Sequence, residues 1–186
     1  MGIIITYNKK CCISIFLLIL FLSTIGTSFA QNSKEYAVKA AFVLNFARYT
    51  QWPNESFSKN TEPLELCVFG DKSLEPEFET IRMKKIGSRP LHIRFIGPSK
   101  DLGQCDLLFV SREIDNSDLQ STFAALKKRP VLTVGESIDF IRHGGIINFL
   151  KREGRFRFEV NPGRAQEQNL KISSRLLKLA IIVGEK

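Results

Sequence analysis

The fold is decided by residues 107–134, whose sequence is LLFVSREIDNSDLQSTFAALKKRPVLTV. One end, Leu107–Val110, is a continuous apolar run, typical of a strand that is buried on both faces of a sheet, and the other end, Val131–Val134, predicts a second buried strand. Between them, Asn116 or Ser117 is a suitable N-cap for a helix that has basic residues in its last turn and ends at a proline. A buried strand, a helix and a second buried strand in succession indicate an α/β protein.

The same alternation continues on the N-terminal side of this stretch. Leu64–Phe69 is a short apolar run that predicts a strand ending at a glycine. From Asp71 or Ser73 to about Lys85 we expect a helix, because acidic residues come early and basic residues late, as the helix dipole favours. Leu91–Ile96 alternates apolar and polar residues, which predicts a half-buried strand.

The C-terminal side adds a hairpin and further helices. Ser137–Arg142 predicts a short helix, and Ile146–Leu150 with Phe156–Val160 predicts a β-hairpin. Asn161-Pro162 and, further on, Ser173 or Ser174 are N-caps of two more helices. We therefore predict an α/β three-layer sandwich, in which helices flank a mixed, mainly parallel sheet that includes a C-terminal β-hairpin.

Residues 1–30 have the pattern of a secretory signal peptide. Lys9 and Lys10 form a positively charged N-terminal region, Ile13–Leu22 is an apolar segment, and Ser28-Phe29-Ala30 is a small-x-small cleavage site. The alternative is a membrane anchor, but the apolar segment has only about ten residues, whereas a spanning helix needs ~20. We expect a cleaved leader at 1–30, one domain at 31–186, and location in the periplasm.

The net charge of the chain limits which kinds of molecule are suitable binding partners. The chain carries 27 basic and 19 acidic residues, and without Lys9 and Lys10 the net charge is +6. A positive protein suits a negatively charged neighbour, either an anionic lipid surface or an acidic partner domain. Nucleic acid is excluded by the expected compartment and because the basic residues are scattered.

Two cysteines, Cys67 and Cys105, remain after removal of the leader. An even number in an oxidising compartment favours a disulfide, and each cysteine lies in or beside a predicted strand. The alternative is a pair of unbonded buried thiols. We predict the disulfide.

The opening helix, from Ser33 to about Tyr49, carries two apolar faces. Tyr36, Ala40, Val43, Leu44 and Ala47 form the expected core-facing side. A second apolar stripe consists of Val38, Phe42, Phe46 and Tyr49. This stripe is explained either by a helix packed between a sheet and another helix, or by a surface that binds a partner or a second copy of the chain.

Residues that could perform catalysis are scarce. The only histidines are His92 and His143, too few for a usual zinc site once the cysteines pair. Glycine-rich phosphate loops and the serine nucleophile motif do not occur in the sequence. Asp106 and Asp115 near one strand are better explained as caps or solvated acids. We expect no catalytic residue, no metal and no cofactor.

Several separated motifs together resemble one known family. They are residues 39–47 (KAAFVLNFA) followed by Trp52-Pro53, and then residues 144–149 (GGIINF), 157–161 (RFEVN) and 170–177 (LKISSRLL). The first is similar to the opening helix, and the others to the closing hairpin and helix, of the YfiR-like periplasmic regulatory proteins. The resemblance covers nearly all of the chain after the leader.

The resemblance implies a homodimer that regulates without catalysing. Its implied partners are the periplasmic sensor domain of a membrane-bound diguanylate cyclase, which it represses, and an outer-membrane lipoprotein, which relieves the repression. This places the chain in the control of cyclic di-GMP and biofilm formation. Family members carry a disulfide that matches Cys67 and Cys105. A second cysteine pair, found in some members near the closing hairpin, is absent here, so switching between two disulfides has no support.

A function of another class remains open at this point. A periplasmic sensor could bind an anionic metabolite near Arg155, Arg157, Arg164 or Arg175. A hydrolase has the least support, because no nucleophile with an adjacent base can be named.

Overall fold

The computed structural model describes residues 26–97, 101–152 and 154–184. Two compact units divide the chain, Met1–Glu35 and Tyr36–Lys186, and the second, which contains the sheet, is described here by itself. Most of the predicted leader, residues 1–25, lies outside the described residues. From Gly26 the chain is helical in α2 (Gly26–Arg48). The helix thus begins before Ser33, because neither proline nor glycine occurs between Thr27 and Arg48 to end it.

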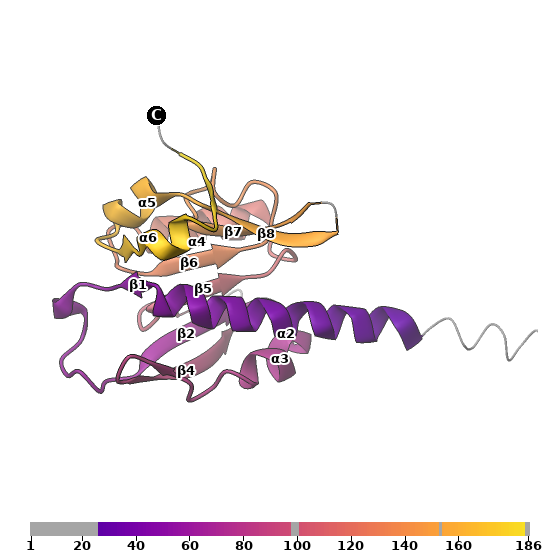
Figure 1. The fold of residues 1–186 in the computed structure, drawn as a ribbon, viewed down its shortest axis with the longest axis horizontal. Coiled ribbons are helices and arrows are strands. Elements are labelled where there is room, and N and C mark those ends of the chain that lie inside the picture. The colour runs from indigo at the N-terminus through magenta and orange to yellow at the C-terminus, as the bar shows by residue number, and fades with distance from the viewer. Residues whose placement is uncertain (1–25, 98–100, 153, 185–186) are drawn as a thin grey trace, which may run out of the picture. The chain divides into compact units, whose positions relative to one another are not determined.

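An eight-stranded sheet forms the centre of the second unit, and its strand order is β10-β8-β7-β6-β5-β2-β4-β3 (Figure 1). The strands are β2 (Leu64–Phe69), β3 (Lys85–Ile86), β4 (Arg89–Ile96), β5 (Leu107–Val110), β6 (Leu132–Gly135), β7 (Ile147–Arg152), β8 (Arg155–Val160) and β10 (Ile181–Ile182). The pairs β2–β4, β2–β5, β5–β6, β6–β7 and β8–β10 are parallel, whereas β7–β8 and β3–β4 are antiparallel. A separate pair, β1 (Thr50–Gln51) with β9 (Lys171–Ile172), is antiparallel.

Helices cover both faces of this sheet, which confirms the predicted mixed, mainly parallel α/β architecture. Leu66 and Val68 of β2 belong to the apolar core that contains α2, whereas Cys67 and Phe69 belong to a second core with α4 (Asn116–Ala125). Successive side chains of a strand point to opposite faces, so one strand contributes to both cores. The hairpin β7–β8 lies where the sequence predicts it.

Three predicted helices are shorter than expected or absent. The segment predicted from residue 71 or 73 to 85 is helical only in η2 (Lys72–Leu74) and α3 (Glu75–Glu79). Met83 then has a φ of 60°, and its amide donates to Leu91 O at 2.8 Å, so the chain joins the sheet edge as β3. The last helix, α6 (Ser174–Leu177), stops early because the chain returns to pair as β10 with β8.

Residues 137–144 form turns instead of the helix predicted at Ser137–Arg142. The double glycine Gly144-Gly145 ends this segment, and Phe140 is buried beneath it. A Cβ atom added to Gly135 or to Gly145 would lie 2.2 Å from the Phe140 ring. Both glycines are therefore needed to make room for one phenyl ring.

The remaining short elements connect these layers. Asn161 caps α5 (Pro162–Glu167), accepting the Arg164 amide at 2.9 Å, as its position before proline predicts. η1 (Asn54–Ser56) follows Trp52-Pro53. The Trp52 indole donates to Asp106 O at 3.2 Å, which holds this loop against the start of β5.

Candidate functional site

Four phenylalanines from α2 and the β7–β8 hairpin form one aromatic cluster. Phe42 and Phe46 are four residues apart on α2, so they lie on the same side of the helix. Phe149 and Phe158 face each other across the hairpin. The ring centroid of Phe46 lies 5.5 Å from that of Phe149 and 4.9 Å from that of Phe158, within the range of favourable aromatic contacts.

An apolar groove of about 200 Å³ lies beside this cluster. Its lining consists of Phe42, Phe149, Phe156, Arg157, Phe158 and Leu179. Leu179 follows α6 and is 74% exposed, although leucine is usually buried. The groove therefore presents aromatic walls and an uncovered aliphatic side chain to its surroundings.

The stripe predicted on the opening helix is divided between core and surface. Phe46 is fully buried by the chain's own hairpin, and Phe42 is half-buried at the groove. Val38 is 43% exposed and Tyr49 is 40% exposed. The contact with a partner or a second copy of the chain stays a prediction for the three residues that reach the surface.

A buried polar cluster, which the sequence did not lead us to expect, surrounds Glu136 just after β6. The Tyr36 hydroxyl donates to Glu136 Oε1 at 2.8 Å, and the Lys39 ammonium group pairs with Glu136 Oε2. Arg112 reaches the same carboxylate at 3.1 Å. Burial and then the negative charge of Glu136 raise the pKa of the Tyr36 hydroxyl above its usual value. These contacts join α2 to the sheet at the carboxyl ends of β5 and β6.

The position of Lys39 in the helical repeat of α2 could have predicted this cluster. Lys39 lies three residues after Tyr36 and four before Val43, which places it on the buried side of α2 rather than on the polar side. Because a fully buried lysine almost always needs an acidic partner, the position should have prompted a search for one. The identity of that partner, Glu136, has no local sequence pattern.

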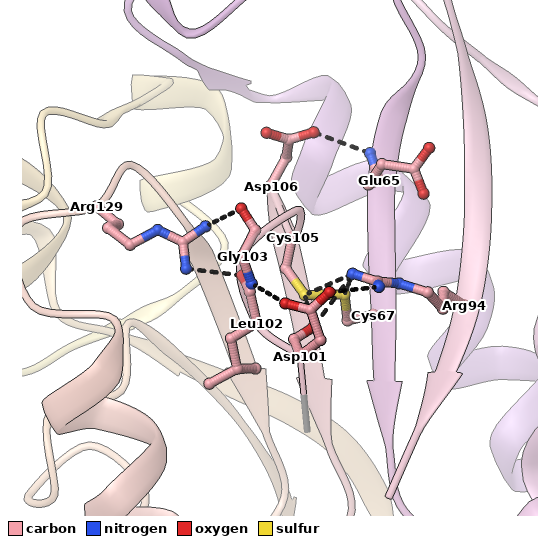
Figure 2. Close-up of a disulfide and its surroundings, with 9 residues drawn as sticks. All are labelled: Glu65, Cys67, Arg94, Asp101, Leu102, Gly103, Cys105, Asp106 and Arg129. Carbon is pink, nitrogen blue, oxygen red and sulfur yellow. Dashed lines mark hydrogen bonds and ion pairs between the residues drawn. A yellow bond between two sulfur atoms is a disulfide. The ribbon is translucent and has the colours of Figure 1, made fainter. Parts of the chain in front are cut away.

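Cys67 of β2 and Cys105, just before β5, form a disulfide, as predicted (Figure 2). Both cysteines are buried, and their Cα atoms are 5.7 Å apart because β2 and β5 are adjacent. The Arg94 guanidinium lies beside the bridge, 3.6 Å from Cys67 Sγ, and pairs with Asp101 at 3.3 Å (Figure 2). The bridge thus ties the middle of the sheet to the loop that precedes β5.

Asp106, the residue after Cys105, lines an open cleft of about 600 Å³. Its carboxylate accepts the Glu65 amide at 2.9 Å. Burial, opposed by this hydrogen bond and reinforced by the charge of Glu65, raises the pKa of Asp106 to about 6. Arg129, which also lines the cleft, donates to Leu102 O and Gly103 O at 2.7 and 2.8 Å (Figure 2). Asp115, the other acid noted from the sequence, is the N-cap of α4.

The four arginines of the predicted anion site have different surroundings. Arg157 lines the apolar groove, whose other walls contain none of Arg155, Arg164 or Arg175. Arg164 donates to Gly144 O at 3.0 Å and to Glu167 at 2.6 Å, so it secures α5. Arg155 is exposed on β8, and Arg175 is exposed in α6.

The histidines have local partners. His92 Nδ1 lies 3.0 Å from Glu65 Oε1, and His143 Nδ1 lies 2.9 Å from Asp139 O. Across residues 26–97, 101–152 and 154–184, no group of three or more His, Cys, Asp or Glu side chains is placed to hold a metal ion. None of the helices in this described part of the chain is long and apolar enough to cross a membrane.

The chain was compared with models of known protein families. The model of a family described as YfiR/HmsC-like matches residues 36–181, which is most of the chain and all of the sheet except Ile182. No curated protein matches the sequence at a significant level.

Proposed function

Because the chain belongs to the YfiR/HmsC-like family, we propose that it is a periplasmic protein that represses a membrane-bound diguanylate cyclase by binding its sensor domain. Residues 1–30 are the cleaved signal peptide in this proposal, and residues 31–186 are the working domain. The Cys67–Cys105 disulfide supports the location, because such bonds persist in oxidising compartments.

The observation that carries the proposal is the apolar groove with Leu179 at its rim. Aromatic pockets that bury a few anchoring side chains dominate the energetics of protein interfaces. An aliphatic or aromatic side chain of the sensor domain would fill the space between Phe42, Phe156 and Leu179. Filling it would remove exposed apolar surface from water, which drives association.

Regulation proceeds by binding alone in this proposal. Tyr36 and Lys39 both bind the buried carboxylate of Glu136. Their contacts hold α2 against the sheet, and so position Phe42 at the groove. The cluster is therefore assigned to positioning the binding surface.

A second copy of the chain and an outer-membrane lipoprotein complete the proposed assembly. Val38 and Tyr49, the exposed members of the α2 stripe, are the residues that we assign to the homodimer contact. The lipoprotein would relieve repression by competing for the protein. Cyclic di-GMP levels, and with them biofilm formation, would then follow the free concentration of this repressor.

Substitution of Leu179 tests the proposal. Leu179→Glu should weaken binding to the purified sensor domain by at least about tenfold, a typical loss for an interface anchor of more than 1 kcal/mol. The matched control is Ile138→Glu, because Ile138 is 94% exposed in a different segment and lines no part of the groove. Calorimetric titration measures both variants.

The cellular version of the test measures cyclic di-GMP. Expression of the native protein beside its cyclase should lower the nucleotide, and Leu179→Glu should not. The chain without residues 1–30 should have no effect, since it would never meet the sensor domain. Unchanged cyclic di-GMP on deleting and on overexpressing the exported protein would refute the proposal.

A further inference from the structure

The outer part of the β7–β8 hairpin extends beyond its neighbours in the sheet. β6 pairs with β7 only at Ile147 and Asn148, and β10 pairs with β8 only at Glu159 and Val160. Residues 149–152 and 155–158, which we call the arm, pair only with each other. Figure 1 shows the arm reaching past the end of β6.

The two faces of the arm differ in chemistry. Residues opposite each other in an antiparallel pair point to the same face. Phe149 and Phe158 form one such pair, and they pack toward α2. Arg152 and Arg155 form another, and Arg157 lies on their side of the ribbon, away from α2. The second face is therefore an arginine face made of Arg152, Arg155 and Arg157.

The arginine face carries three exposed positive charges. All three side chains are exposed, and among the described residues none forms an ion pair with them. Arg152 and Arg155 lie directly opposite each other. Two like charges in that position destabilise a β-ribbon. An external anion bound between the two arginines would attract both of them and so offset their mutual repulsion.

The geometry favours many anions in a plane over one small anion. The three arginines lie along one face of a two-stranded ribbon, and Arg157 alone among them lines the groove. Lys151 lies opposite Phe156, on the other face of the ribbon, so the arginine face consists of the three arginines. The forked guanidinium group suits phosphate oxygens.

We propose that the arginine face of the arm docks on the anionic phospholipid surface of a membrane. Phosphate head groups neutralise Arg152, Arg155 and Arg157 together, and the arm lies along the bilayer surface without inserting a helix. This inference goes beyond the proposed repression of a cyclase and does not require that partner. It would confine the protein to the layer in which a membrane-bound target is found.

The experiment measures partition of the protein, purified after export, onto lipid vesicles. Vesicles that contain phosphatidylglycerol should bind it, and vesicles of pure phosphatidylcholine should not. Each cation near an anionic surface contributes about fivefold to partition, so Arg155→Gln should weaken it by about that factor. The triple variant Arg152→Gln, Arg155→Gln, Arg157→Gln should weaken it on the order of 100-fold. Salt at about 1 M, with a screening length of roughly 3 Å, should abolish binding.

A second triple variant controls for net charge. Lys72→Gln, Lys84→Gln and Lys127→Gln remove three exposed cations from other segments, and partition should remain near that of the native protein. Because Arg155→Gln relieves repulsion, its thermal midpoint should equal or exceed the native value, which separates lost binding from lost folding.

Three results would overturn the inference. The first is equal partition onto charged and uncharged vesicles, and the second is equal loss of partition in the two triple variants. The third is a triple arginine variant that no longer binds an acidic protein but partitions onto vesicles as the native protein does. A failure of the cyclase proposal would leave the vesicle measurements unaffected, so the two ideas fail separately.

Discussion

The ammonium group of Lys39 and the carboxylate of Glu136 form an ion pair inside the protein, where the Lys39 residue is only 1% exposed. Ninety-seven residues of chain separate the two. Glu136 also accepts from the Tyr36 hydroxyl and from Arg112, so its charge is satisfied from several directions. The pair fixes the part of α2 around Lys39 to the carboxyl end of β6, one of the inner strands of the sheet.

Removal of one partner from this ion pair should be costly. Lys39→Met leaves the buried Glu136 carboxylate without its nearest cation, and such changes typically destabilise by about 3–5 kcal/mol. Urea unfolding followed by circular dichroism measures the loss.

The double variant Lys39→Met, Glu136→Gln is the informative control for this pair. Because it removes both charges, it should recover part of the loss. Losses in the double variant equal to the sum of the single losses would show that the two side chains act independently.

The disulfide should contribute to stability through the unfolded chain. Cys67 and Cys105 are 38 residues apart, and a bridge that closes such a loop contributes about 2–4 kcal/mol. Cys67→Ala with Cys105→Ala should lose this amount in urea unfolding. Dithiothreitol should destabilise the native protein and leave the double variant unchanged. Two free thiols in the exported protein, detected by mass spectrometry without reduction, would disprove the bridge.

Asp106 should make the protein less stable as pH rises from about 4 to about 6. Burial raises its folded pKa to about 6, above the ordinary value of 3.8, so in this range the folded state holds the proton more firmly than the unfolded state. Stability then falls with rising pH, because the unfolded chain binds fewer protons. Asp106→Asn should flatten this slope and stabilise the protein at pH 7.5 by about 1–3 kcal/mol.

Asp101→Asn is the matched control for the pH dependence. Hydrogen bonds from Gly103 and Arg94 lower the pKa of Asp101, so this carboxylate stabilises the fold above its unfolded pKa and the effect is lost as pH falls. The two substitutions should therefore change the pH profile in opposite directions. A profile that Asp106→Asn leaves unaltered would show that the carboxyl titrates normally.

Tyr49 offers a sharper test of the homodimer than Phe42 does. Phe42 packs against Phe149 and Phe158, so charging it would disturb the core as well as the surface. Tyr49 is 40% exposed at the end of α2. Tyr49→Glu with Val38→Glu should shift light scattering from dimer to monomer while the circular dichroism spectrum is retained. A native protein that is already monomeric at high concentration would argue against the contact.

Local patterns were sufficient for the longer strands β2, β4, β5, β6, β7 and β8, for the hairpin and for the disulfide, but not for the two-residue strands. Leu107–Val110 is apolar on both faces, and Val131–Val134 is apolar except at Thr133, so each strand can be recognised from its own residues. Where the sequence failed, contacts distant in the chain decided the structure. The helix after Asp71 ends early because Met83 bonds to Leu91 in β4, and the last helix ends early because Ile181 pairs with β8.

The candidate site was only partly predictable for the same reason. Phe42 and Phe46 were identified from helical spacing, but the groove also needs Phe156, Phe158 and Leu179 from the end of the chain. Phe46 looked equivalent to Phe42 in the sequence, yet the hairpin covers one and leaves the other at the rim. Which aromatic side chain is covered depends on tertiary packing that no local pattern encodes.

The Phe140 ring between Gly135 and Gly145 limits how this sequence can diverge. A methyl group at either glycine would overlap the ring, so neither position can change while residue 140 stays aromatic. For Gly135, a smaller residue at 140 would have to arise first, and it would leave a cavity that a later enlargement of the glycine could fill. At Gly145 an added Cβ would also lie 2.8 Å from the backbone carbonyl oxygen of residue 140, so this glycine is needed whatever side chain stands there. Positions 135 and 140 are therefore expected to evolve together, as one compensating pair, in descendants of this gene.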